Sequence, residues 1–113
     1  MIPNANSSSV PTRIWVATGP VDMRRSFDAL AEHVRSFLGQ NPLSGHLFVF
    51  RNRPGDKVKI LWWDATGLVL YYKRLEKGAF QFPARADKVL TLSSAQLLRL
   101  LQGARWADDG DDA

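Results

Sequence analysis

The chain contains no cysteine among its 113 residues. Disulfide bonds and thiolate metal sites are therefore excluded as sources of stability or chemistry. No apolar run approaches the roughly 20 residues needed to cross a bilayer, and the first ten residues lack the hydrophobic segment of a signal peptide. These absences predict a cytoplasmic protein without a membrane partner.

Acidic residues are scarce outside the C-terminal end. The formal net charge is +4, but four aspartates occupy the last six positions, so residues 1–107 hold 15 basic and 7 acidic residues, a formal charge of +8. Arginine outnumbers lysine two to one, and its planar guanidinium suits phosphate groups and base edges. A body this basic is a candidate for binding an anionic partner, although small basic domains also occur without one.

The length and composition indicate a single domain with two polar ends. Residues 1–12 are rich in Ser, Asn and Pro, which predicts a disordered lead-in. Residues 107–113 contain the four aspartates and are predicted to form a disordered acidic tail. Residues 13–106 are then one domain, long enough to bury a core of its own.

Three apolar runs separated by turn residues dominate the middle of the chain. Short runs of this composition between Gly- and Pro-containing turns are typical of consecutive antiparallel strands. A shorter run, Ala79–Phe82, predicts a fourth strand of the same meander, ended by Pro83. The three longer runs are His46–Arg51, Lys57–Asp64 and Leu68–Leu75.

The flanking segments predict two helices. Asp22–Leu38 carries an apolar stripe at helical spacing, with Asp22 as the expected N-cap. Ser93 is the expected N-cap of a second, shorter helix over Ser94–Gln102.

Two short extended segments complete the prediction. Arg13–Ala17 reads as a strand that joins the sheet at an edge or pairs with the last short strand, and Val89–Leu92 is a further extended segment. The expected fold is α+β: an antiparallel sheet of about five strands packs against the long N-terminal helix. The short C-terminal helix closes an end or part of the other face.

Basic and aromatic residues alternate with apolar ones along the meander. On the second strand, alternation places Trp62 on a buried face and Trp63 on the face that carries lysines. Cations that meet phosphates beside rings that stack on bases are typical of nucleic-acid surfaces. Alternatively, Trp63 packs under a helix and the lysines are only solvated. The candidate nucleic-acid-binding residues are Arg51, Arg53, Lys57, Lys59, Trp63, Lys73 and Arg74.

Four of these cations bracket one turn, Asn52–Asp56. Hairpin geometry brings them close together, and each close pair repels by about 1 kcal/mol in a water-like dielectric. We therefore hypothesise that the cations around this turn meet an anion. They are Arg51, Arg53, Lys57 and Lys59.

A second candidate surface would bind a protein partner. Arg24 and Arg25 lie in the first turn of the expected helix, where cations oppose the helix dipole. They either meet a partner or are compensated by Asp28. Leu97 and Leu101 belong to a leucine-rich last helix, which either forms a partner surface or is buried in the core.

No combination of residues indicates catalysis. His33 and His46 lie thirteen positions apart without further metal-type ligands at useful spacing, and the glycines fit turns rather than a phosphate loop. The acidic residues read as caps, turn residues or ion-pair partners rather than ligands for two metal ions. The sequence predicts no catalytic residue, no metal site and no cofactor.

Two long motifs resemble a known family. The run PLSGHLFVFRNRPGDKVKILWWDATGLVLYYKRLEKGAFQFP and the segment DMRRSFDAL are similar to the TnpB accessory proteins of the insertion-sequence-66 family of bacterial mobile elements. A third piece, LSSAQL followed by LLQG, is similar to the closing helix of that family. The resemblance runs from near Arg13 to Trp106. The chain departs from the pattern at Ser26, Ala29, Phe82 and Arg105.

The resemblance implies a non-catalytic role in transposition and DNA recombination, because the transposase of these elements is a separate, larger protein. Element DNA, the transposase and other element-encoded proteins are the implied partners. The first mechanism is contact with element DNA through the sheet and its turn. The second is an adaptor that docks on the transposase without binding DNA, and a nuclease is third. The oligomeric state is left open.

Overall fold

The computed structural model describes residues 12–82 and 87–103. The predicted lead-in, except for its last residue, and the predicted acidic tail lie outside these ranges, as do residues 83–86 and 104–106 of the predicted domain. The described residues form a small α+β domain with five strands and two helices. The elements are β1 (Ile14–Ala17), α1 (Phe27–Ser36), β2 (Leu47–Arg51), β3 (Lys57–Trp63), β4 (Leu68–Arg74), β5 (Val89–Leu92) and α2 (Ser94–Leu101).

The five strands form one mixed sheet in the order β4-β3-β2-β1-β5. The prediction of a purely antiparallel sheet is wrong at one junction, because β1 and β2 run parallel. Between them α1 carries the chain across a face of the sheet and back to the end where β1 began, and this crossover produces a parallel pair. The other three junctions are antiparallel.

Two predicted strand placements need correction. β1 is neither an edge strand nor paired with Ala79–Phe82, because it lies between β2 and β5. Ala79–Phe82 is not a strand. Its Phe80 donates a backbone N–H to the carbonyl of Gly55 at 2.8 Å and is buried. This segment therefore covers the end of the β2–β3 hairpin, and β5 supplies the fifth strand.

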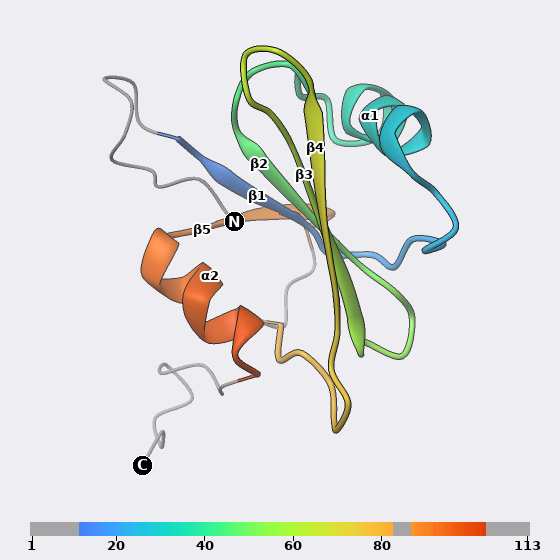
Figure 1. Ribbon diagram of the computed structural model, residues 1–113, viewed down its shortest axis with the longest axis vertical. Helices are drawn as coiled ribbons and strands as arrows, with labels where there is room; N and C mark the ends of the chain where they lie inside the picture. The colour runs from blue at the N-terminus through green and yellow to red at the C-terminus, as the bar shows by residue number, and fades with distance from the viewer. Residues whose placement is uncertain (1–11, 83–86, 104–113) are drawn as a thin grey trace.

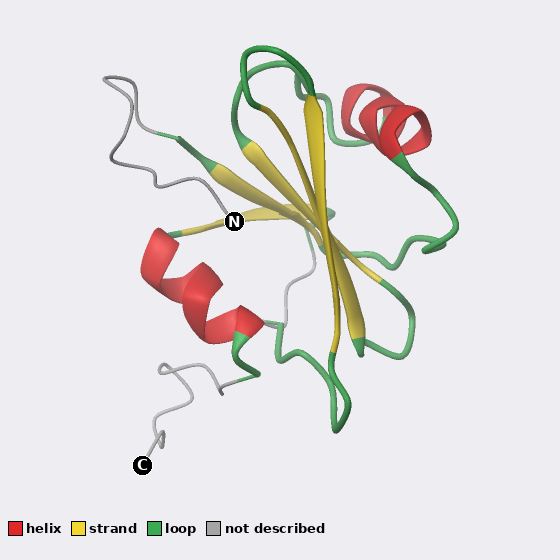
Figure 2. Cartoon of the chain, in the orientation of Figure 1, coloured by secondary structure: helices red, strands yellow, loops and turns green. Residues whose placement is uncertain are grey.

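The two helices cover opposite faces of the sheet, as Figures 1 and 2 show. Leu30 and Val34 of α1 pack with Phe48 and Phe50 of β2 on one face. On the other face, leucines of α2 pack with the alternate residues of β1, β2 and β3. The expected split of β3 is confirmed, since Trp62 is 5% exposed in the core on the α2 side and Trp63 is half-buried.

The first helix is shorter than predicted at its N-terminal end. It begins at Phe27, with Ser26 at the N-cap, and not at Asp22. The carbonyls of Met23 and Arg25 accept hydrogen bonds from the ammonium of Lys59. In a helix that began at Asp22 these two carbonyls would instead accept the N–H groups of Phe27 and Ala29, so a buried tertiary contact competes with the helix.

The second helix begins where the sequence predicts. The hydroxyl of Ser93 accepts the backbone N–H of Gln96 at 3.1 Å, and the side chain of Gln96 accepts the N–H of Ser93 at 2.8 Å. This reciprocal capping box fixes the start of α2 directly after β5. Neither described helix is both long and apolar enough to cross a membrane.

Candidate nucleic-acid interface

The segment between β1 and α1 is a loop built around the carboxylate of Asp22. This carboxylate accepts the backbone N–H of Arg24 at 2.8 Å, and the Arg24 guanidinium donates to it at 2.7 and 3.0 Å. The side-chain contact with Arg24 is the main reason that the pKa of Asp22 falls to about 2. The Arg24 side chain is 92% exposed. The loop therefore presents this guanidinium to solvent in a defined position.

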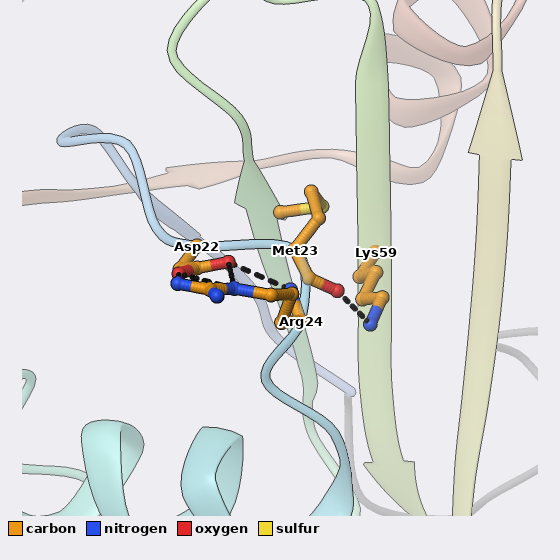
Figure 3. Close-up of polar contacts among 4 residues, drawn as sticks. All are labelled: Asp22, Met23, Arg24 and Lys59. Atoms are coloured by element: carbon orange, nitrogen blue, oxygen red, sulfur yellow. Dashed lines mark hydrogen bonds and ion pairs between the residues drawn. The ribbon is translucent and has the colours of Figure 1, made fainter.

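Lys59 of β3 lies beside the loop, and its ammonium donates to the carbonyl of Met23 at 2.7 Å (Figure 3). The same ammonium donates to the carbonyl of Arg25 at 2.6 Å and lies 4.6 Å from the centroid of the Tyr72 ring. Burial lowers the pKa of Lys59, and Asp22 opposes this shift. The residue is only 5% exposed. Lys59, selected from sequence as a nucleic-acid contact, is instead placed as an internal support of the loop.

The turn between β2 and β3 is organised by the buried amide of Asn52. Its Oδ1 accepts the backbone N–H groups of Gly55 at 2.9 Å and Lys57 at 3.0 Å, while its amide nitrogen donates to Asp56 at 2.7 Å. Gly55 has a φ of +83°, which favours glycine. The turn leaves Arg53 exposed and Lys57 half-exposed.

Arg51 fastens the loop to the turn. Its guanidinium donates to the carbonyl of Thr18 through Nε at 3.0 Å and Nη2 at 2.6 Å, and its own carbonyl accepts the N–H of Val21 at 2.8 Å. The guanidinium also lies 5.8 Å from the ring centroid of Phe82. Much of the hydrogen-bonding capacity of Arg51 is thus used inside the protein.

The loop and the turn together line a surface hollow of about 400 Å³. Pro20 to Met23 contribute from the loop, and Asn52, Arg53 and Lys57 contribute from the turn. Arg24 is bound to Asp22 on the loop side. The structure therefore brings Asp22, the ion-pair partner of the predicted partner-binding Arg24, to the same hollow as two of the predicted nucleic-acid-binding cations, although about thirty residues separate them in the chain.

Two further predicted cations are engaged elsewhere. The ammonium of Lys73 donates to the carbonyl of Leu101 at 2.7 Å, which is the C-terminal end of α2 on the opposite face of the sheet. Arg74 pairs with Lys57 in the β3–β4 register, and its Nε lies 3.1 Å from a carboxylate oxygen of Glu76. Lys73 therefore lies apart from the hollow, whereas Arg74 borders the same end of the sheet.

Tyr72 lies closer to this surface than Trp63 does. Trp63 lies six positions along β3 from Lys57, about 20 Å at the usual rise per residue. Tyr72 is paired with Lys59 in the register and is 53% exposed. Alternation along the strand places Tyr72 on the same face as Arg74, and this is the signal for Tyr72 that the sequence contains. The ring of Tyr72 is exposed on β4, which is an edge strand of the sheet. The sequence did not show this edge position.

The leucines predicted to bind a partner are in the core. Leu97 is 3% exposed and Leu101 is 6% exposed, both within the cluster on the α2 side. The leucine at the surface of α2 is Leu98, which is 59% exposed. Two alternatives were open for the leucine-rich helix, a partner surface or burial in the core. Leu97 and Leu101 are buried in the core.

The comparison with known families decides the identity. A family model described as IS66 Orf2 like protein matches residues 12–110. The chain belongs to the IS66 Orf2-like family. Two relatives from Sinorhizobium fredii (strain NBRC 101917 / NGR234), "Uncharacterized protein y4hO" and "Uncharacterized protein y4jC", are 46% and 40% identical over 94 residues. The alignments cover 83% of this chain in both cases, and 82% and 80% of the relatives. No solved structure matches.

Family membership identifies this IS66 Orf2-like protein as an accessory protein associated with an insertion sequence. The names of the two relatives assign no activity. Within residues 12–82 and 87–103, no group of three or more His, Asp or Glu side chains is arranged to hold a metal ion. The hollow between the loop and the turn combines exposed cations with a defined geometry.

Proposed function

We propose that this IS66 Orf2-like protein is a non-catalytic accessory protein of transposition that contacts the phosphate backbone of element DNA at the hollow. The observation that carries the proposal is that Arg53 and Lys57 line a concave surface whose other wall holds Asp22, the ion-pair partner of the exposed Arg24. Internal residues hold both sides of it in place. Cations held in fixed positions can bind phosphates without the loss of conformational entropy that ordering a mobile loop would require.

Electrostatics favours a phosphate ligand at this place. Asp22 also lines the hollow, but Arg24 donates to its carboxylate through two guanidinium nitrogens, so its negative charge is matched. Arg53 and Lys57 then add two positive charges on the turn side. Phosphate contacts of this kind position a protein on DNA but do not by themselves read the sequence. The exposed ring of Tyr72 adds a surface on which an unpaired base can stack.

A salt titration tests the proposal quantitatively. Neutralising two phosphates with Arg53 and Lys57 should give a slope of about −1.8 for the logarithm of the binding constant against that of salt concentration. The affinity for a DNA duplex should then fall about 12-fold between 50 and 200 mM salt. A slope near zero would contradict phosphate binding.

Charge reversal locates the contact. The double variant Arg53→Glu with Lys57→Glu should abolish DNA retention and leave the melting temperature unchanged or slightly raised, because it relieves repulsion around the turn. The matched control is Arg35→Glu with Lys88→Glu, which changes the net charge equally at exposed positions away from the hollow. If both double variants lose DNA equally, net charge rather than this surface is responsible.

The second candidate function is an adaptor that docks on the transposase without binding DNA. The exposure of Phe27 and Phe37 at the two ends of α1, at 43% and 44%, favours it, because large apolar side chains at the surface suit a protein partner. Absence of DNA binding by the parent protein even at low salt, together with retention of the purified transposase, would select this function. Loss of transposase binding in the charge-reversal variant alone would place that partner at the same hollow.

A further inference from the structure

The described sheet has two edges that differ in kind. β5 has four residues and leads directly into α2, and short edge strands of this sort are protected against further pairing. β4 has seven residues, pairs with β3 at seven consecutive positions and has no described strand on its other side. A long, regular edge strand presents a row of unpaired backbone groups to any further strand.

The hydrogen bonds at the two ends of the β3–β4 pair show which residues face outward. Asp64 donates its N–H to Gly67 at 3.0 Å, and Leu75 donates its N–H to Asp56 at 2.8 Å. Backbone direction alternates along an antiparallel strand, so the residues of β4 with the parity of Gly67 and Leu75 point their backbone groups at β3. The residues whose N–H and C=O groups point away from the sheet are Leu68, Leu70, Tyr72 and Arg74.

The side chains of β4 favour one orientation of a second, identical strand. Residues Leu68 to Tyr72 carry no charge, whereas Lys73 and Arg74 stand together at the C-terminal end. Parallel pairing in register would place each cation beside its own copy, and like charges directly opposite are destabilising. Antiparallel pairing places each cationic end beside the partner's uncharged end, so the strand is complementary to itself.

We propose that a second copy of this chain pairs with the first through the outer edge of β4, antiparallel, with Tyr71 on the two-fold axis. The hydrogen-bonded pairs are then Leu68 with Arg74 and Leu70 with Tyr72, which uses every outward-facing residue of the strand. The two Tyr71 rings lie at a non-hydrogen-bonded position, where side chains approach most closely. The interface is isologous and closes at two copies, giving one continuous ten-stranded sheet.

The first test is the oligomeric state and its dependence on one outward N–H group. The parent should sediment as a dimer at tens of micromolar. The substitution Leu70→Pro removes an outward N–H without removing a bond to β3, and proline is tolerated on edge strands. It should sediment as a monomer with a native circular dichroism spectrum. The matched control Leu70→Ala keeps the N–H, loses more of the side chain and should remain a dimer.

The second test uses the absence of native cysteine to read the register. In the proposed dimer Tyr71→Cys meets its own copy at a Cα separation of about 4.5 Å, within the range for a disulfide bond. Leu70→Cys and Tyr72→Cys meet their own copies only diagonally, at about 7–8 Å, which is too far. Mild oxidation should cross-link the Tyr71→Cys chain at least about ten times faster than either neighbour.

Three results would overturn the proposal. A parent that remains monomeric at 100 μM, with no cross-link at any of the three positions, removes the interface. A Leu70→Pro variant that is folded and still dimeric places the contact elsewhere. Fastest cross-linking at Leu70→Cys or Tyr72→Cys shifts the two-fold axis by one residue and contradicts the register.

Discussion

Replacement of Lys59 by methionine tests whether this residue is a structural support rather than a ligand-binding cation. Methionine has a side chain of similar length and apolar character but no ammonium. The variant therefore removes the two hydrogen bonds to the carbonyls of Met23 and Arg25 while it keeps the packing along β3.

Two opposing terms set the size of the effect. Hydrogen bonds to a charged group contribute about 1.5–3 kcal/mol each, so the two bonds represent about 3–6 kcal/mol. Removing a buried ammonium also relieves a desolvation cost, which can offset much of this gain. Met23 is half-buried and Arg25 is exposed, so water can replace part of what their carbonyls lose. We expect a net destabilisation of about 2–3 kcal/mol.

The assay is equilibrium unfolding in urea followed by tryptophan fluorescence, with the melting temperature as a second measure. A loss of 2–3 kcal/mol should lower the melting temperature by about 10–20 °C for a domain of this size. Lys73→Met, which removes one such bond to Leu101, should cost about half as much. Lys57→Met, at a half-exposed position, should change stability by less than about 0.5 kcal/mol.

The reasoning fails if Lys59→Met is as stable as the parent or more stable. In that case the desolvation of the ammonium outweighs its two hydrogen bonds, as happens for some buried charges. The reasoning also fails if the variant is destabilised but binds DNA with unchanged salt dependence. The loop would then hold its position without Lys59.

Three further predictions concern the loop and the second helix. The pKa of Asp22 is about 2 in the folded protein, below its ordinary value of 3.8. Its carboxylate therefore contributes fully to stability above pH 3.8, and this contribution is lost as the pH falls from 3.8 through 2. Asp22→Asn should therefore flatten the decrease of stability between pH 4 and pH 2 in urea titrations, and an unchanged slope would show that the loop does not depend on this charge. Ser93→Ala removes the capping box of α2 and should cost about 1 kcal/mol of unfolding free energy, while Ser93→Asp should restore most of it. Leu97→Ala should cost about 2–5 kcal/mol because the side chain is buried, whereas Leu98→Ala should cost less than about 0.5 kcal/mol in the same unfolding assay; equal costs would mean that α2 is rotated about its axis.

The sequence alone predicted those features that depend on one strand or one helix cap. The alternation of β3 placed Trp62 in the core and Trp63 at its margin, because neighbouring side chains on a strand point to opposite faces. Ser93 and Gln96 specified the start of α2 through contacts three residues apart. The motifs of the meander and of the DMRR segment were long enough to indicate the family, which the family model confirms.

The order of the strands and the fate of each cation depended on contacts distant in sequence. The residues of Arg13–Ala17 do not by themselves show that this segment lies between β2 and β5. The strand order depends on how the crossover through α1 and the helix α2 pack on the two faces of the sheet. The apolar periodicity predicted a helix that begins at Asp22. A periodic pattern contains no information on Lys59, which lies thirty-six positions from Met23 and binds its carbonyl.

Charge and aromatic content were thus properties of the sequence alone: a basic body, a cationic turn, and strands that carry rings. Which cations are available to a ligand was decided by the tertiary structure. Lys59 and Lys73 are used as donors to backbone carbonyls, whereas Arg24 and Arg53 remain exposed. The physical reason is that a long cationic side chain gains most where unpaired carbonyls of another segment come within reach, and only folding brings them there.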